Sequence, residues 1–492
     1  MTADMACLIS LVLLTAIGAA LRLWQIRSGL FGDELYAFSE TAGASFGEVL
    51  ENVSQKSIEV TPPLFFVLAS AAERLGDAAT TVRIPSEVAG ILLIPAMFVL
   101  GKAGVDRRVG LVASALTTFS VYGIYYSVEA RPYSLLMLFS AVSTICLFKL
   151  IDQGRRRWLV GYSLASAAVL YTHYSGVGVL AAQFGWAVWF HRDHWRGLVA
   201  GNLVAGLLFL VWVPSISLKE GAKATVDPFS PGVESLVSWA RQLVTLPYGD
   251  AGFTDLPGIP SLVILGLCLT VGAVGTAVRQ GDRAYRLRPG STQALFPVLM
   301  LASPAFMLLA SLATGLGFLQ PRYFSASFPA LIVTVSALLA MSDRRLGIVI
   351  SGVAVAVSAF SAVKAQQPRY QRPDMRAVAR WVDAPGPRNA VIADWILPYN
   401  GQNTLRPYLE VPARDRSAFP LGNGISQVEN ASLIGADVVL VTNAGFLRET
   451  ERSITSNPRY RLKFVRTARW PGLVGGIRAS WFVFTGSKPA KQ

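Results

Sequence analysis

Eleven long apolar runs divide this chain, and they restrict its fold more than any other feature of the sequence. A helix needs about 20 predominantly apolar residues to cross the roughly 30 Å hydrocarbon core of a membrane. A hydrophobic fraction of 52%, a charged fraction of 15% and a mean hydropathy of +0.45 agree with a chain that lies largely in lipid. The runs, with ends good to a few residues, are 5–24, 84–101, 109–127, 132–151, 158–171, 174–190, 197–216, 260–278, 293–313, 323–341 and 345–364.

These runs predict an α-helical polytopic membrane protein with about 11 transmembrane helices. Two of the runs, 158–171 and 174–190, are short and are also compatible with one interrupted helix. The first run has neither a basic leading region nor a small-residue cleavage site, so we interpret it as a span and not as a signal peptide.

The net charge of +14 indicates membrane topology and not nucleic-acid binding, because the arginines cluster in short segments between apolar runs. If the N-terminus is cytoplasmic, all five basic connections face the cytoplasm, as the positive-inside rule expects. The other connections then face outward and carry the acids, prolines and aromatic residues. The basic segments are "GKAGVDRR", "DQGRRR", "HRDHWR", "RQGDRAYRLR" and "SDRR".

The composition changes after about residue 366, where charge increases and β-branched stretches such as "NAVIADW" and "ADVVLVTNAG" occur. We predict two domains: a transmembrane catalytic domain, 1–366, and a small extracytoplasmic α/β domain, 367–492. In the tail, "PDMRAVARWVD" has helical periodicity. The basic stretch "RYRLKFVRTARW" is typical of a solvated strand face, and binding of an anionic glycan or lipid is the alternative.

The first outer loop, 25–83, contains two local signals. The segment "FGEVLENVSQ" reads as an amphipathic helix lying in the membrane interface. The pair Pro62 and Pro63 in "VTPPLFFVL" marks a helix that begins directly after it, because the residue before a proline avoids the helical conformation. The second long outer loop, 217–259, carries Trp239 and Tyr248, which suit the headgroup belt.

Several ionisable residues fall at the outward ends of the expected spans and so share one membrane face. Such groups are costly in lipid and usually line a cavity, where they are paired or bind ligand. An ordinary interfacial charge is the alternative for each one taken singly, but their common depth favours a polar site in the outer half of the bundle. They are Asp33, Glu34, Glu59, Arg83, Glu129, Arg131, His173 and Arg322.

The residue types suggest chemistry for this site. Asp33 can accept a proton from an attacking hydroxyl, or together with Glu34 it can hold a divalent cation. The planar guanidinium groups of Arg131 and Arg322 suit phosphate. His173, between Tyr171 and Tyr174, is either a ligand or an interfacial histidine bonded to backbone. The three cysteines, by contrast, lie in apolar runs and indicate neither a disulfide nor a zinc site.

The chain resembles the polytopic C-type (GT-C) glycosyltransferases, in particular the bacterial relatives of protein O-mannosyltransferases and of the lipid A aminoarabinose transferase. The resemblance extends over residues 5–341 and lies in an ordered set of motifs, each of them weak alone. These are "FGDELYAF", "TPPLFF", "RIPSEVAGILLIP", "VEARPYSLLMLFS", "THYSG" and "PRYFSASFPAL".

The resemblance implies an inverting transferase that moves a hexose or pentose from a polyprenyl-phosphate donor to an envelope glycan, glycolipid or protein. The reaction is expected at the outer face of the bacterial cytoplasmic membrane. Asp33 occupies the position of the family's first-loop acid, followed by Glu34, both expected to be catalytic. The remaining expectations concern binding of donor phosphate or substrate, by Arg131, Tyr133, Arg322, Tyr323, His173, Glu129 and Glu59.

A divalent cation such as Mg²⁺, Mn²⁺ or Ca²⁺ is the candidate cofactor, with Asp33 and His173 as its candidate ligands. Two departures from the aminoarabinose branch argue against aminoarabinose as the sugar. Val60 and Thr61 stand where that branch has a Glu-Lys pair, and Arg131 stands where it has an acid.

Two other functions remain open from the sequence. A transporter or flippase of a lipid-linked or envelope solute is the alternative from another class, but transporters typically have two matching halves, which this chain lacks. A ligase for lipid-linked oligosaccharides would keep the chemistry and change the reaction.

The topology can be tested by cysteine labelling in a background without the three native cysteines. We expect Asp33→Cys to react with an impermeant maleimide on intact cells, because it lies in the first outer loop. Arg155→Cys should react only after permeabilisation, because it lies in a basic cytoplasmic loop. The opposite labelling pattern would contradict the site assignment.

Overall fold

The structure of the protein, a computed structural model, consists mostly of apolar helices joined by polar connections. It describes residues 3–26, 28–30, 33–56, 61–215, 259–280, 290–340, 344–383, 391–394, 408, 437–443, 456–472 and 476–486. The expected interfacial segment with Trp239 and Tyr248 therefore lies outside the described residues.

The chain forms two compact units. The first consists of Met1–Ile26 and Ala37–Ala365, and the second of Arg27–Tyr36 and Gln366–Gln492. Residues 27–36, which the sequence analysis assigned to the transmembrane part, thus group with the C-terminal residues. Helix α2 (Asp33–Thr41) begins in the second unit and ends in the first.

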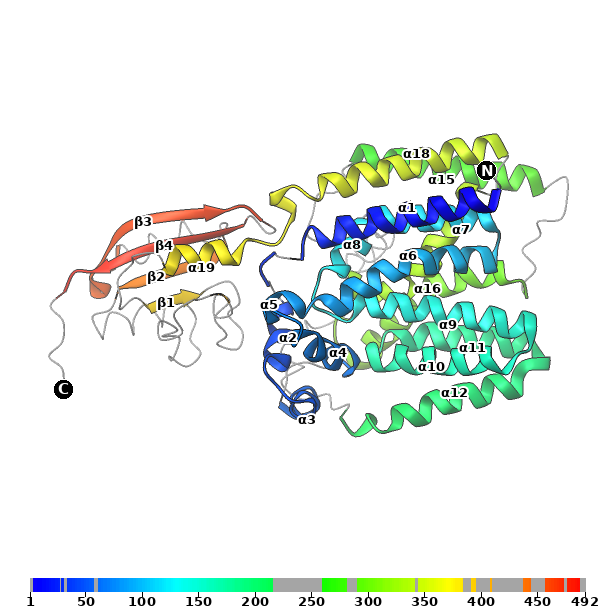
Figure 1. Cartoon of the computed structure of the whole chain (residues 1–492), viewed down its shortest axis with the longest axis horizontal. Coiled ribbons are helices and arrows are strands. Elements are labelled where there is room, and N and C mark those ends of the chain that lie inside the picture. Colours follow the sequence, from blue (N-terminus) through cyan, green and yellow to red (C-terminus); the bar gives the residue numbers. More distant parts are fainter. Residues whose placement is uncertain are drawn as a thin grey trace. The chain divides into compact units, whose positions relative to one another are not determined.

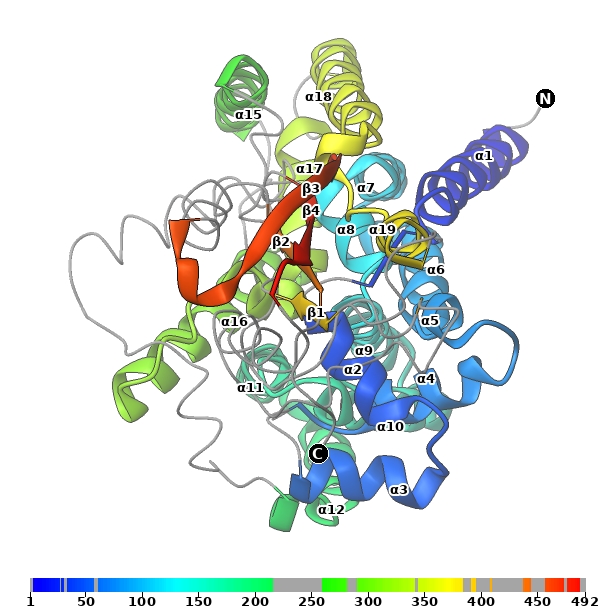
Figure 2. The same ribbon diagram turned by 90° about the vertical axis from the view of Figure 1, so that its left-hand side faces the viewer.

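The first unit is a bundle of helices (Figure 1), with α9 in its middle (Figure 2). Its helical elements are α1 (Ala3–Leu23), α3 (Phe46–Glu51), η1 (Asn52–Lys56), α4 (Leu64–Glu73), α5 (Ala78–Thr81), α6 (Ile84–Gly104), α7 (Arg107–Phe119), α8 (Val121–Ser127), α9 (Tyr133–Gln153), α10 (Arg156–Thr172), α11 (Gly176–Phe190), η2 (Arg192–His194), α12 (Trp195–Leu210), η3 (Val213–Ser215), α15 (Ile259–Gln280), α16 (Thr292–Thr314), η5 (Pro321–Ser327), α17 (Phe328–Ala340) and α18 (Arg344–Lys364).

Local sequence signals determine where several of these helices begin and end. Helix α3 begins with a capping box, in which the Ser45 and Glu48 side chains each accept a hydrogen bond from the other residue's backbone N–H. Asp106 caps α7 through the backbone N–H groups of residues 108 and 109. Helix α4 begins at Leu64, directly after the proline pair, as predicted.

Each of the 11 apolar runs coincides with a helix or a pair of adjoining helical elements. Among the described residues, six helices are long and apolar enough to cross a membrane. Helices α7 and α8 pass the same test only as a pair, which bends by 59° at Ser120 and raises the number of candidate spans to seven if it counts as one span. The multi-pass helical fold is thus confirmed, whereas the count of 11 spans is not.

The connections sort into two ends of the bundle, as the topology argument predicted. At one end, the expected cytoplasmic connections meet: Arg107 bonds Asp4 at 2.6 Å, and Thr292 donates to the carbonyl of Gly104 at 2.7 Å. At the other end, Arg83 donates to the carbonyl of Ile26 at 3.1 Å. The alternating in-and-out order of the spans accounts for both sets of contacts.

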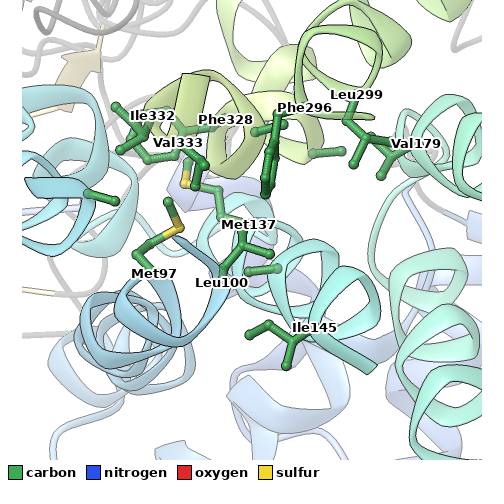
Figure 3. Close-up of a cluster of buried hydrophobic side chains, with 14 of the residues drawn as sticks. Met97, Leu100, Met137, Ile145, Val179, Phe296, Leu299, Phe328, Ile332 and Val333 are labelled. Atoms are coloured by element: carbon green, nitrogen blue, oxygen red, sulfur yellow. The ribbon is translucent and has the colours of Figure 1, made fainter. Parts of the chain in front are cut away.

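The core of this unit is one large cluster of buried apolar side chains from α6, α7, α9, α16, α17 and their neighbours. Figure 3 shows part of it, with Met97, Met137, Phe296 and Phe328 among the labelled residues. Helices α6 and α7 approach unusually closely, because glycine stands on both sides of the contact. A Cβ atom on Gly101 would lie 2.7 Å from the Cα atom of Gly110.

The second unit contains a four-stranded sheet in the order β1-β2-β4-β3. Strand β1 pairs with β2 in parallel, and the other two pairings are antiparallel. Helix α19 packs Met375, Val378 and Ala379 against side chains of β2 and β4. The elements are η6 (Pro368–Tyr370), α19 (Met375–Asp383), β1 (Val391–Asp394), β2 (Val438–Asn443), η9 (Pro458–Tyr460), β3 (Leu462–Trp470) and β4 (Ile477–Phe484).

This arrangement confirms the small α/β architecture predicted for the tail. The helix predicted in "PDMRAVARWVD" is α19, and the two β-branched stretches contain β1 and β2. The basic stretch predicted as a strand face is β3, an edge strand with mostly exposed side chains.

The glycine contact between α6 and α7 predicts a specific loss of stability. We expect Gly101→Ala to lower the thermal unfolding temperature of the purified protein, because its methyl group collides with backbone that can move only by separating the helices. Overpacking of this kind costs about 1–3 kcal/mol.

The matched control is Gly185→Ala in α11, where a Cβ atom meets nothing within 4 Å. Alanine has the higher helix propensity, so this control should leave the unfolding temperature unchanged or slightly raised. Equal effects of the two substitutions would mean that the α6–α7 contact is not tight.

Candidate functional site

The predicted site residues fall into two groups, one in each unit. The first unit holds the segment 129–133, His173 and the pair Arg322 and Tyr323. The second unit holds Asp33 and Glu34. Glu59 lies outside the described residues.

Arg131 lies on a short buried connection between α8 and α9. Its backbone N–H donates to the carbonyl of Glu129 at 2.7 Å, and its own carbonyl accepts a hydrogen bond from Ser86 Oγ at 2.8 Å. Glu129 and Arg131 are only 9% and 5% exposed, and Pro132 begins α9 directly afterwards. The connection is therefore fixed on both sides, which restricts where its two charged side chains can reach.

A buried hydrogen-bond network around Arg22 holds the end of α8, where this connection begins. Arg22, fully buried at the end of α1, donates to Ser127 Oγ at 3.0 Å and to the carbonyl of Gly18 at 2.9 Å. It also reaches the carbonyls of Thr117 and Thr118. Ser127 ends α8, so the arginine joins α1 to the segment that carries Arg131.

The sequence analysis missed Arg22. A signal was present, because an arginine at the end of an apolar run is costly in lipid and normally turns toward the protein interior. Glu87, in α6, interacts electrostatically with Arg22 and Arg83. All three side chains are at most 3% exposed.

His173 follows α10 and is held by Ser175. The backbone N–H of Ser175 donates to His173 Nδ1 at 3.1 Å, and Ser175 Oγ lies 2.9 Å from the same nitrogen. Because a backbone N–H can only donate, Nδ1 is an acceptor, and the neutral ring carries its proton on Nε2. His173 therefore presents an N–H donor and not a lone pair.

Rings from two other segments flank His173. The ring centroids of Tyr133 and Tyr323 lie 5.7 Å and 5.2 Å from that of His173. Arg322 places its guanidinium carbon 5.2 Å from the centroid of the Tyr323 ring. Tyr171 and Tyr174, which lie next to His173 in the sequence, bond to residues 208 and 212, in the last turn of α12 and just beyond its end.

Hydroxyl groups fix the segment that carries Arg322 and Tyr323. Ser303 Oγ donates to the carbonyl of Tyr323 at 2.7 Å, and Ser325 Oγ donates to that of Arg322 at 2.7 Å. The Tyr122 hydroxyl lies 2.8 Å from both the Pro321 carbonyl and Ser325 Oγ.

The rings of Tyr133, His173 and Tyr323 lie together, Arg322 lies against Tyr323, and Arg131 stands two residues before Tyr133 in the chain; we call these five residues the arginine–tyrosine cluster. The three rings join two segments that each bear an arginine, and every member was predicted from the sequence. Two permanent cations, aromatic faces and an N–H donor are suited to an anion with oxygen acceptors, such as a phosphate.

The two acids of the second unit have different surroundings. Both lie in the first turn of α2, where the helix dipole favours negative charge. Glu34 is fully buried, and its Oε2 lies 2.8 Å from Nε of Arg372. Asp33 is half-buried. No sequence signal identified Arg372, which is a single arginine ahead of a helix.

The predicted cation site is not confirmed. In the part of the chain that the structure describes, no group of three or more His, Cys, Asp or Glu side chains could hold a metal ion. His173 is also a poor ligand as placed, because a metal binds the unprotonated ring nitrogen and Ser175 already occupies it.

An apolar groove lies along α12. Its volume is about 360 Å³, and it is lined by Phe184 of α11 and by six residues of α12 from Val199 to Leu210. Near its Leu210 end, the Tyr171 hydroxyl donates to the carbonyl of Leu208, and Trp212 donates to the hydroxyl of Tyr174. The groove therefore runs toward the chain segment that carries His173.

Comparisons with known proteins agree with this fold. Residues 60–217 match the family model described as dolichyl-phosphate-mannose-protein mannosyltransferase. No curated protein sequence matches the chain.

Among solved structures, apo ArnT from Cupriavidus metallidurans is similar with a TM-score of 0.61 and 11% identity, over 98% of each chain. ArnT bound to undecaprenyl phosphate is similar with a TM-score of 0.56 and 13% identity, over 100% of each chain. The oligosaccharyltransferase AglB from Archaeoglobus fulgidus, in complex with an inhibitory peptide and a dolichol-phosphate, has a TM-score of 0.51 and 12% identity, over 89% of this chain and 69% of AglB.

Residues 60–217 thus resemble the dolichyl-phosphate-mannose-protein mannosyltransferase family, and the chain as a whole shares its fold with ArnT and with AglB.

Proposed function

We propose that this protein is an inverting glycosyltransferase that uses a polyprenyl-phosphate sugar. It moves a hexose or pentose to an envelope glycan, glycolipid or protein. The reaction takes place at the extracytoplasmic face of the bacterial cytoplasmic membrane, with the N-terminus in the cytoplasm. No nucleic acid takes part.

The observation that carries this proposal is the arginine–tyrosine cluster in a GT-C fold. Arg131 and Arg322 bind the donor phosphate, with Tyr133, Tyr323 and the His173 N–H as additional donors. In the reaction the phosphate departs with added negative charge, which fixed cations stabilise more strongly than they stabilise the bound donor. The similarity to ArnT with undecaprenyl phosphate bound supports a phosphate ligand of this type.

Asp33 is the base in this proposal. Its carboxylate takes the proton of the acceptor hydroxyl while that oxygen forms a bond to the anomeric carbon. The bond from the anomeric carbon to the phosphate oxygen breaks on the opposite face, and its electron pair leaves with the polyprenyl phosphate. The anomeric configuration is therefore inverted. Glu129 and Glu59 contact the sugar or acceptor through hydrogen bonds.

The apolar groove along α12 suits the polyprenyl chain. A hydrocarbon chain needs apolar walls, and the groove offers them from Val199 to Leu210. The groove runs toward the segment of His173, which belongs to the phosphate site of this proposal. Transfer of a lipid-linked oligosaccharide by a ligase is an alternative, since AglB, which shares the fold, is an oligosaccharyltransferase.

The proposal predicts transfer by the purified protein from one of a panel of radiolabelled polyprenyl-phosphate hexoses and pentoses to extracted envelope glycolipids. Polyprenyl-diphosphate sugars belong in the same panel. We expect Asp33→Asn to lower kcat by about 100-fold or more, because general bases contribute rate factors of this size.

The control is Asp77→Asn, an exposed acid in the same outer loop, which should transfer at the wild-type rate. Wild-type transfer by folded Asp33→Asn would remove this acid from the mechanism. Failure of the wild-type protein with every donor would contradict the proposed function itself.

The arginines should act on the phosphate. We expect Arg131→Gln and Arg322→Gln each to lower kcat/KM for the donor by about 10- to 100-fold, since a hydrogen bond to a charged group contributes about 1.5–3 kcal/mol. Competition by free undecaprenyl phosphate should weaken in parallel. Arg74→Gln, at an exposed arginine of the outer loop, is the control, and equal losses there would contradict a specific phosphate site.

A further inference from the structure

The first turn of α2 is joined to the C-terminal sequence by a buried ion pair. Glu34 Oε2 lies 2.8 Å from Arg372 Nε, and the two side chains are 0% and 2% exposed. Both residues belong to the second unit, although they are far apart in the chain. Burying two charges is costly, and an apolar pair of similar volume is often at least as stable. The pair therefore suggests a role in orientation more than in stability.

Two further contacts fix the same short segment. The backbone N–H of Leu30 donates to the Tyr408 hydroxyl at 2.6 Å, and Leu30 is fully buried. Gly29 lies so close to Met375 that a Cβ atom on it would be 2.5 Å from Met375 Cγ. Residues 29–34 thus meet the C-terminal part of the unit at three points.

The C-terminal partners of this segment are themselves rigidly held. Met375 is fully buried and packs in the core between α19 and the sheet, with Val441 and Ile477. Pro373 is fixed by Gly472, where a Cβ atom would lie 2.8 Å from the proline ring. Arg372 is therefore anchored through its neighbours to the sheet, and it transmits that anchoring to Glu34.

Asp33 precedes Glu34 in the same helical turn. Successive residues of an α-helix point about 100° apart, so holding Glu34 inside the unit fixes the backbone of this turn and with it the direction of the Cα–Cβ bond of Asp33. A displacement of about 1 Å at a reacting group can cost about 100-fold in rate. A catalytic base at a helix terminus therefore needs neighbouring contacts, here the pair of Glu34 with Arg372, to hold its position to within such a distance.

We propose that Arg372 is a positioning residue for the transfer reaction: through its buried pair with Glu34 it holds Asp33 in place, so that the C-terminal domain is a component of the catalytic machinery. The inference rests on the proposed function. It assigns Glu34 to orientation and leaves proton transfer to Asp33.

The test compares Arg372→Gln and Glu34→Gln with the double charge reversal Glu34→Arg/Arg372→Glu in the full chain. Each single variant should lower kcat by about 100-fold while KM for the donor stays within about twofold, because the phosphate site lies on other residues. The double reversal restores the pair and should recover at least about tenfold of the lost kcat. Arg380→Gln, an exposed arginine of α19, should behave as wild type.

Thermal unfolding of each purified variant separates misplacement from unfolding, since breaking a buried pair can be strongly destabilising. If the neutral variants do not fold, Arg372→Lys tests whether Arg372 positions Asp33, because it keeps the charge and loses the guanidinium. It should unfold near the wild-type temperature and have a kcat about tenfold lower.

Two results would overturn the inference while wild-type transfer is intact. One is wild-type kcat in folded Arg372→Gln or Arg372→Lys. The other is a folded double reversal that is no more active than the single variants. A wild-type protein that transfers nothing is a different failure, because it removes the proposed function on which the inference rests.

Discussion

A polar group inside a membrane protein has no water to bond, so each one must find its partner within the chain. In this bundle several polar side chains next to the site find such partners. Arg22 bonds Ser127 and three carbonyls, and Ser303, Ser325 and Tyr122 fix the loop of Arg322. The site segments are thus held by hydrogen bonds that lipid makes costly to break.

The parts of the proposed reaction are supplied by different parts of the molecule. The bundle provides the phosphate cluster and the apolar groove, and both are made by helix ends and faces that the alternating spans bring together. The acid of the first loop belongs to the second unit and depends on the C-terminal sheet through Arg372 and Met375. In the proposed reaction, donor binding and base positioning therefore depend on separate hydrophobic cores.

The helices and the grouping of three site residues could be predicted from the sequence, because a membrane requires long apolar helices and excludes charge from the lipid. The apolar runs matched the helices, and the topology argument brought Tyr133, His173 and Tyr323 to one end. The sequence did not indicate the partners of Tyr171 and Tyr174, which bond to residues 208 and 212 at the end of α12. The pair of Glu34 with Arg372 was not predictable, since nothing in either local sequence indicates a partner so distant in the chain. The number of spans predicted from the apolar runs is not confirmed, because several of them form helices of fewer than 18 described residues.

The fit of Gly29 against Met375 also bears on how such enzymes can be recombined. A chimaera that joins this bundle to the C-terminal domain of another transferase at a single junction near residue 366 would leave residues 27–36 facing a foreign surface. A side chain on residue 29 would collide with a residue placed like Met375, and a domain without a cation opposite Glu34 would leave that buried carboxylate without its partner. Domain exchange in this fold therefore calls for two crossover points, so that the short N-terminal segment travels with the sheet that holds it.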